Sequence, residues 1–97
     1  MTISKEKNGS SLTIGIAGRL DTMTAPQLEA EIKALDGVTE LVFDFSQLEY
    51  ISSAGLRVLL SAQKQMSNHG NMTVKNVNDV VMEIFEVTGF SDILNIE

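Results

Sequence analysis

The 97-residue sequence predicts one α/β domain built on a mixed, mostly parallel sheet. Two observations lead to this fold class. Stretches whose apolar residues alternate with period two are separated by stretches whose apolar residues recur at helical spacing. Turn-forming residues stand at the boundaries between them. The predicted order is strand, strand, helix, strand, helix, strand, helix, with a short final strand or turn in the tail. No repeat or linker interrupts this order, so residues 1–97 are expected to form a single domain.

The first two elements are predicted to form an antiparallel hairpin. Thr2 to Lys7 is polar and weakly alternating, as in an edge strand. Asn8-Gly9 is a strong turn signal, because both residue types tolerate the positive φ that a tight hairpin demands. In residues 12–17 bulky aliphatic side chains alternate with small ones, which indicates a strand with one bulky and one small face.

A helix is expected to follow, beginning near residue 25. Thr24 with Gln27 fits a capping box, and Pro26 is tolerated in a first helical turn. Asp36-Gly37 is expected to end the helix, with the glycine in the left-handed conformation. One apolar face is marked at helical spacing by Ala25, Leu28, Ile32 and Leu35.

The next strand is predicted at Leu41 to Phe45, where both faces are nearly apolar. That pattern favours a central strand covered on both sides. The helix after it carries an apolar stripe and ends at Asn68-His69-Gly70. The stripe consists of Leu56, Leu59, Leu60, Gln63 and Met66.

The last predicted strand and helix occupy residues 72–88. Met72 to Val77 reads as the fourth strand, and Asn78 is a good N-cap for the third helix. Gly89 is expected to stop that helix. The expected shared face of the helix consists of Val81, Ile84, Phe85 and Thr88. Strands joined through helices pair in parallel by right-handed crossovers, so the hairpin supplies the one antiparallel edge.

Composition limits the classes of function. The formal charge is −6, from 13 acids and 7 bases, and the bases are scattered singly. Nucleic-acid binding is therefore disfavoured, and the dispersed acids are typical of a solvated surface. No apolar run approaches the roughly 18 residues of a membrane span, so we expect no direct membrane insertion. The N-terminal residues lack the apolar core of a signal peptide, and there is no cysteine, which together favour the cytoplasm.

The sequence offers little for catalysis, so we expect no enzyme, no metal and no cofactor. The only histidine, His69, lies about 16 residues or roughly 24 Å of helix beyond Ser53, too far to activate that hydroxyl. No cysteine or second histidine accompanies it as a metal ligand, and the carboxylates lack calcium-loop spacing. The segment from Gly15 to Gly18 lacks the glycine spacing of a dinucleotide fingerprint.

Ile51-Ser52-Ser53-Ala54-Gly55-Leu56 places two hydroxyls where an apolar strand ends and an apolar helix begins. A helix start presents free N–H groups and the positive end of the helix dipole, so a serine there can carry a phosphoryl group. The alternative, commoner on spacing alone, is that one serine only caps the helix. Gly55 costs on the order of 1 kcal/mol in a first turn, which indicates close approach by a partner or by a packed strand.

These segments together resemble the STAS domain family, of the anti-sigma factor antagonist type, over essentially the whole chain. Gly18-Arg19-Leu20-Asp21 resembles the family's glycine-x-leucine-aspartate, and Leu41 to Phe45 resembles its buried central strand. Residues 51–56 resemble its Asp-Ser-Ser/Thr-Gly signature, with Ser52 at the position of the usual aspartate. The resemblance implies a mixed sheet with helices packed largely on one side.

The resemblance also implies a partner switch. The unmodified protein would bind an anti-sigma factor that is also a serine kinase and so release a sigma factor. Phosphorylation of Ser53, or less favourably of Ser52, would end binding, and a PP2C-type phosphatase would restore it. The kinase would hold ATP and magnesium, so this chain needs no cofactor. The residues expected to contact the partner are Asp21, Ser52, Ala54, Gly55, Leu56 and Arg57.

Two other functions stay open at this stage. The first is a STAS-like docking subunit of a membrane transport or signalling complex, which would use the same surface without phosphorylation. The second is a small enzyme or ligand-binding module that uses the helix start as an anion site.

Overall fold

The strands of the sheet follow the order β1-β2-β3-β4 from one edge to the other. In the computed structural model, which describes all 97 residues, β1 (Thr2–Asn8) and β2 (Ser11–Leu20) form an antiparallel hairpin. β3 (Glu40–Ile51) pairs in parallel with β2, and β4 (Asn71–Lys75) pairs in parallel with β3. The predicted α/β class, element order and mixed, mostly parallel sheet are confirmed.

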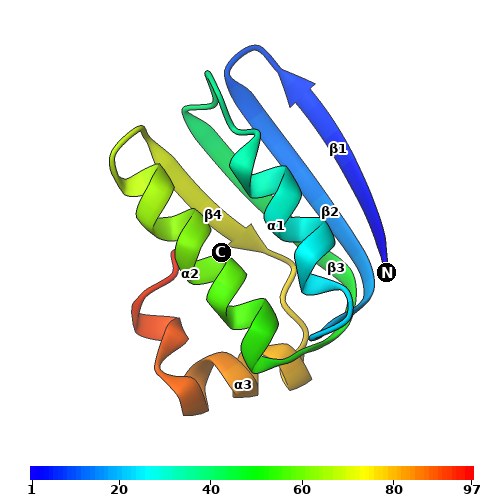
Figure 1. Ribbon diagram of the computed structural model, residues 1–97. Helices are drawn as coiled ribbons and strands as arrows, with labels where there is room; N and C mark the ends of the chain where they lie inside the picture. Colours follow the sequence, from blue (N-terminus) through cyan, green and yellow to red (C-terminus); the bar gives the residue numbers. More distant parts are fainter.

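Two helices connect successive parallel strands, and a third helix follows β4. α1 (Ala25–Lys33) and α2 (Ser53–Ser67) lie side by side over one face of the sheet, and α3 (Asp79–Thr88) lies across one end (Figure 1). A short 3-10 turn, Phe90–Asp92, follows α3. None of these helices combines the length and the apolar character that crossing a membrane requires.

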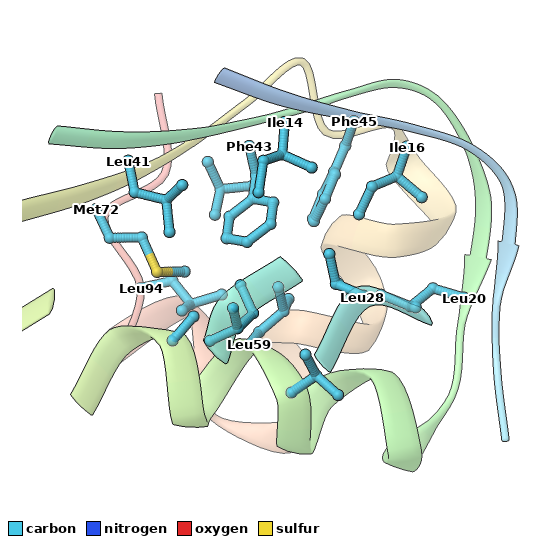
Figure 2. Packing of buried hydrophobic residues seen from close by; sticks show 14 of the residues in the cluster. Ile14, Ile16, Leu20, Leu28, Leu41, Phe43, Phe45, Leu59, Met72 and Leu94 are labelled. Carbon is cyan, nitrogen blue, oxygen red and sulfur yellow. The ribbon is translucent and has the colours of Figure 1, made fainter. Parts of the chain in front are cut away.

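The core fills the space between the helices and one face of the sheet (Figure 2). Alternate side chains of β2 and β3 point into it, among them Ile14, Ile16, Phe43 and Phe45. Phe45 also contacts Phe85 of α3, with ring centroids 6.5 Å apart. Helices and sheet therefore share one continuous apolar cluster.

The expectation that the strand around Leu41 to Phe45 is covered on both sides is wrong. Val42 and Asp44 alternate with the buried residues and are only half-buried, because no helix packs on their side of the sheet. The Asp44 carboxylate accepts hydrogen bonds from the Asn76 side chain and the Ser46 amide, each 3.0 Å long. These bonds hold the pKa of the Asp44 carboxyl below its usual range. The second face of the sheet is thus polar.

Several element boundaries differ from the predicted ones by one to three residues. The hairpin turn consists of Gly9 and Ser10, because Asn8 still pairs with Ser11. α1 ends at Lys33, although Gly37 does adopt a left-handed φ of 80°. In the tail, Ile96 forms a single parallel bridge to Val74. The tail, predicted as a short final strand or turn, therefore forms the 3-10 turn and this bridge.

Asn78 anchors α3 at its N-terminus, as the sequence predicts. Its side-chain oxygen accepts a hydrogen bond of 2.8 Å from the Val81 amide. Its side-chain nitrogen donates one of 2.7 Å to the Leu48 carbonyl of β3. At the other end Gly89 takes a φ of 83° and closes the helix. Asn78 therefore both caps α3 and ties it to the sheet.

We expect Asn78→Ala to lower the free energy of unfolding by about 1–3 kcal/mol, because it removes the cap and leaves the Leu48 carbonyl unpaired. Asn78→Ser keeps a capping oxygen but cannot reach Leu48, so it should lose less. Urea denaturation of the natural chain and both variants measures the order of their free energies of unfolding. An Asn78→Ala variant as stable as the natural chain would contradict the role of Asn78 as the cap of α3 and its link to β3.

Candidate functional site

The two segments singled out in the sequence meet at the edge of the sheet where β2 and β3 end. Leu20 of β2 pairs with Ile51 of β3, and the Ser52 amide donates a hydrogen bond of 2.9 Å to the Leu20 carbonyl. Because parallel strands end at the same edge, Asp21 and Ser52 follow them as neighbours. The site thus combines residues about thirty positions apart in the chain.

The serine pair divides into a buried and an exposed hydroxyl. Ser52 has the extended backbone of an N-cap, and its carbonyl accepts the hydrogen bond of 2.9 Å from the Leu56 amide. Its side chain nevertheless makes no cap hydrogen bond, and its oxygen is buried without a partner. Ser53 is the first residue of α2 and is exposed. Ser52 therefore occupies the N-cap position, as the capping alternative expects, but its hydroxyl makes no capping hydrogen bond.

Gly55 packs against the strands. A Cβ atom at this position would lie 2.7 Å from Ile51 Cγ1, 2.8 Å from Leu20 Cγ and 3.0 Å from the Leu20 carbonyl oxygen. Of the two explanations for this glycine, close helix–strand packing is the one that the structure shows. The absence of a side chain lets the start of α2 sit directly on the ends of β2 and β3.

Leu56 also belongs to the core, with 6% of its surface exposed. Gly55 and Leu56, which the sequence places among the expected partner contacts, therefore offer a partner little side-chain surface. Both are held by the packing of α2 onto the sheet. The expected contact residues with solvent-accessible side chains are Asp21, Ala54 and Arg57, beside the exposed Ser53.

The loop between β2 and α1 is fixed by Asp21 and Thr24. One carboxylate oxygen of Asp21 accepts hydrogen bonds from the amides of Met23 (3.0 Å) and Thr24 (3.2 Å). The Thr24 hydroxyl accepts one of 2.8 Å from the Asp21 amide and donates one of 2.8 Å to the Arg19 carbonyl.

The predicted capping box of Thr24 and Gln27 is therefore wrong. Thr24 has helical backbone angles, and a side-chain cap normally needs an extended residue. Its hydroxyl turns back toward the end of β2. The Asp21 carboxylate satisfies the free amides that precede α1 instead.

Asp21 is held as an anion at the strand end. Partial burial by itself raises the pKa of the Asp21 carboxyl, but the hydrogen bonds from Thr24 and Met23 and the nearby Arg19 hold the pKa below its usual range. Arg19 Nε lies 3.8 Å from the carboxylate, and the Arg19 guanidinium stacks 4.4 Å from the centre of the Tyr50 ring. A fixed negative charge and a fixed positive charge thus mark this edge of the sheet.

A shallow groove of about 240 Å³ lies between the N-terminal parts of α1 and α2, next to Ser53. From α2 it is lined by Ala54, Arg57 and Val58, and Arg57 is exposed and makes no ion pair. Arg57 stands four residues after Ser53, so the two lie one turn apart on the same helix face. The side of the groove toward α1 is lined by Thr22, Ala25, Pro26 and Glu29.

Sequence reasoning missed that second side of the groove. The sequence could have predicted it, because two helices that each follow one of two neighbouring parallel strands are expected to pack side by side. That packing brings the start of α1 next to the start of α2. His69, in contrast, lies beyond the C-terminal end of α2, so the structure places it away from Ser53 as the spacing predicts.

A family model described as "Mlab, STAS domain" matches residues 3–95. The chain therefore belongs to the STAS domain family. This confirms the family that the three sequence motifs indicated.

Two curated relatives match nearly the full chain. BtrV of Bordetella bronchiseptica is 36% identical over 96 residues, which cover 96% of this chain and 83% of BtrV. The anti-sigma-B factor antagonist of Listeria monocytogenes is 29% identical over 97 residues, which cover 96% of this chain and 84% of that protein.

Solved structures share the fold. An anti-sigma factor antagonist from Mycobacterium paratuberculosis superposes with a TM-score of 0.88 at 25% identity, over 98% of this chain and 83% of that one. The Bacillus cell fate determinant SpoIIAA in its phosphorylated form gives 0.77 at 19% identity, over 99% and 91%. A sulfate transporter family protein from Wolinella succinogenes gives 0.78 at 15% identity, over 89% and 72%.

We expect Gly55→Ala to lower the free energy of unfolding by about 1–3 kcal/mol, because the added methyl overpacks the contact with Ile51 and Leu20. Ser53→Ala is the matched control two residues away, and it should change stability by no more than about 0.5 kcal/mol, since the exposed hydroxyl makes no hydrogen bond. Thermal and urea unfolding measure both variants. A Ser53→Ala variant that unfolds would show that this residue is structural first.

The lowered pKa of Asp21 predicts that the carboxylate contributes to the free energy of unfolding in a way that depends on pH. A carboxyl whose pKa is lower in the folded state stabilises the fold above the ordinary aspartate pKa of about 3.9, and this contribution is lost as the pH falls through the folded value. Asp21→Asn should therefore show a smaller loss of stability between pH 7 and pH 2.5 than the natural chain. Carboxyl NMR titration checks the direction, and an Asp21 pKa above 3.9 would contradict it.

Proposed function

We propose that this protein is an anti-sigma factor antagonist that is switched by phosphorylation of Ser53. The observation that carries the proposal is the exposed, unbonded hydroxyl of Ser53 at the first position of α2, beside an open groove. The Listeria relative is an anti-sigma-B factor antagonist, and SpoIIAA, which shares the fold, has been solved in a phosphorylated form. Both support the proposal.

The two serines differ in their suitability as phosphate acceptors. A kinase needs the acceptor oxygen at the surface, where it can attack the γ-phosphorus of ATP while ADP leaves. The Ser52 oxygen is buried, whereas Ser53 is exposed. This difference favours Ser53 as the acceptor.

The fold can carry the modified residue without unfolding. A phosphate on Ser53 would stand at the N-terminus of α2, where free N–H groups and the helix dipole favour negative charge. Arg57, one turn further and free of any ion pair, can reach it as a charge-assisted hydrogen-bond donor. The buried Gly55 and Leu56 keep the helix in place in both states.

The phosphate on Ser53 acts by lowering the affinity of this surface for the partner. In the unmodified protein the surface around Ser53, Ala54 and Arg57, with the groove and Asp21, is open to an anti-sigma factor. Phosphorylation adds about −1.5 to −2 charge at its centre. That charge must be desolvated or must repel the partner, so the affinity falls.

The remaining chemistry belongs to the partners. The anti-sigma factor is proposed to be the serine kinase that holds ATP and magnesium. A PP2C-type phosphatase is proposed to transfer the phosphoryl group from Ser53 to water and restore the binding form. This chain contributes a substrate hydroxyl and a docking surface, and the cycle is proposed to run in the cytoplasm.

The second candidate is a docking subunit of a transport or signalling complex. The sulfate transporter family protein of Wolinella succinogenes shares the fold, so the fold is compatible with both functions. The groove beside Ser53 could receive a helix of another protein without any modification.

We expect Ser53→Ala to keep partner binding and Ser53→Asp to weaken it at least tenfold, or about 1.4 kcal/mol. Both proteins serve as bait in a lysate of the source organism, followed by mass spectrometry and titration of the purified partner. Ser61→Asp is the matched control, because it adds the same charge at an exposed position two turns further along α2. It should bind like the natural chain.

The outcomes separate the two candidates. A kinase-fold protein retained by Ser53→Ala and lost with Ser53→Asp supports the switch. A transporter subunit bound equally by both variants would move the assignment to the docking subunit and leave Ser53 without a regulatory role.

A further inference from the structure

α3 carries more apolar surface than the core covers. Val81 and Phe85 are fully buried against the sheet. On another side of the same helix Val80 is 57% and Val87 is 81% exposed, and Ile84 between them is half-buried. Among the large apolar residues of this chain, Val87 is exceeded in exposure only by Met23.

These three residues form one continuous stripe. Positions 80, 84 and 87 have the spacing i, i+4, i+7, which places them on one side of a helix over two turns, or roughly 10 Å. With Glu83 and Thr88 they line a shallow groove of about 270 Å³. The Thr88 hydroxyl is already bonded to the Ile84 carbonyl of its own helix at 2.6 Å, so its hydrogen is not free for another acceptor.

Local stability of α3 does not explain the exposed valines. Valine is a weak helix former, and the helix is already fixed by the Asn78 cap, by Gly89 and by the buried Val81 and Phe85. A contiguous apolar stripe of this kind is typical of a surface that a partner covers.

The charges on α3 select the kind of partner. Asp79, Glu83 and Glu86 are its only charged residues, and all three are acidic. On a helical wheel the three acids lie side by side along one flank of the apolar stripe, and Glu83 is the acid next to Val87. A second copy of this chain would bring the same acids and a formal charge of −6 to the contact, so self-association on this face is disfavoured.

We infer that the outer face of α3, formed by Val80, Glu83, Ile84 and Val87, is a docking surface for an amphipathic helix whose apolar stripe is flanked by lysine or arginine. Apolar side chains of that helix would fill the groove, and its bases would pair with the acids of α3. The surface shares no residue with the groove beside Ser53, so the inference goes beyond the proposed switch and does not rest on it.

The probe is a designed helical peptide of about five turns, with leucines at i, i+3, i+4 and i+7 spacing and lysines along both flanks. A second peptide carries glutamate at every lysine position. The full chain, labelled with ¹⁵N, is titrated with each peptide by NMR. We expect the lysine peptide to shift the amides of α3, to bind at least tenfold more tightly than the glutamate peptide, and to weaken as salt is added.

Variants of the stripe test the site. The double variant Val80→Ser with Val87→Ser should lose at least tenfold in affinity for the lysine peptide. Both positions are at the surface, and a thermal melt of the variant confirms its fold. Met23→Ser is the matched control, since Met23 is 85% exposed on the loop before α1, and it should bind like the natural chain.

Three results would overturn the inference. The first is that the lysine peptide shifts amide resonances outside α3, or that the double variant binds this peptide as tightly as the natural chain does. The second is equal binding of the lysine and glutamate peptides, which would remove the argument from charge. The third is a dimer in light scattering that dissociates in the double variant, which would make a second copy of the chain the occupant.

Discussion

The parallel pairing of β2 with β3 is the constraint on which the rest of the structure depends. It brings the ends of both strands to one edge, and the bond from the Ser52 amide to the Leu20 carbonyl carries the pairing one step beyond the last strand residue. The start of α2 can rest on this edge because Gly55 has no side chain between it and Leu20. Every candidate contact residue takes its position from this junction.

At this junction, residues that are neighbours in the sequence differ in role: some pack α2 onto the sheet and others face solvent. Gly55 and Leu56 are buried and fix α2 on the sheet, whereas Ser53 and Arg57 project into solvent. The helix period makes this possible, since residues one turn apart share a face and their immediate neighbours do not. A change of charge at Ser53 can therefore alter binding without disturbing the packing that displays it.

α1 and α2 lie on one face of the sheet and α3 lies across one end (Figure 1), so the other face has no helix over it. The other face must be polar, and the hydrogen-bonded Asp44 carboxylate at its centre illustrates this. The helices in turn must cover the whole apolar face alone. α3 contributes Val81 and Phe85 to this cover, while Val80 and Val87 on its outer side stay exposed.

The sequence by itself determined the element order, the hairpin, the cap and stop of α3, and the position of the serine pair at the start of α2, because these follow from local periodicity and from single residues such as Asn78 and Gly89. It also determined the family, through motifs read together. Boundaries such as the end of α1 at Lys33 were less certain, since a later glycine can take a left-handed φ without ending the helix.

The apolar face of α1 was predicted from its spacing, but only the tertiary structure decided whether the second face of the central strand β3 is covered. From the sequence, the strand around Leu41 to Phe45 was expected to be covered on both faces. Val42 and Asp44 lie on its second face, and no helix packs there. The burial of the Ser52 oxygen, the contact that requires Gly55 and the groove between α1 and α2 arise from segments far apart in the chain. Such contacts depend on how elements pack, and periodicity within one element carries no information about its neighbours.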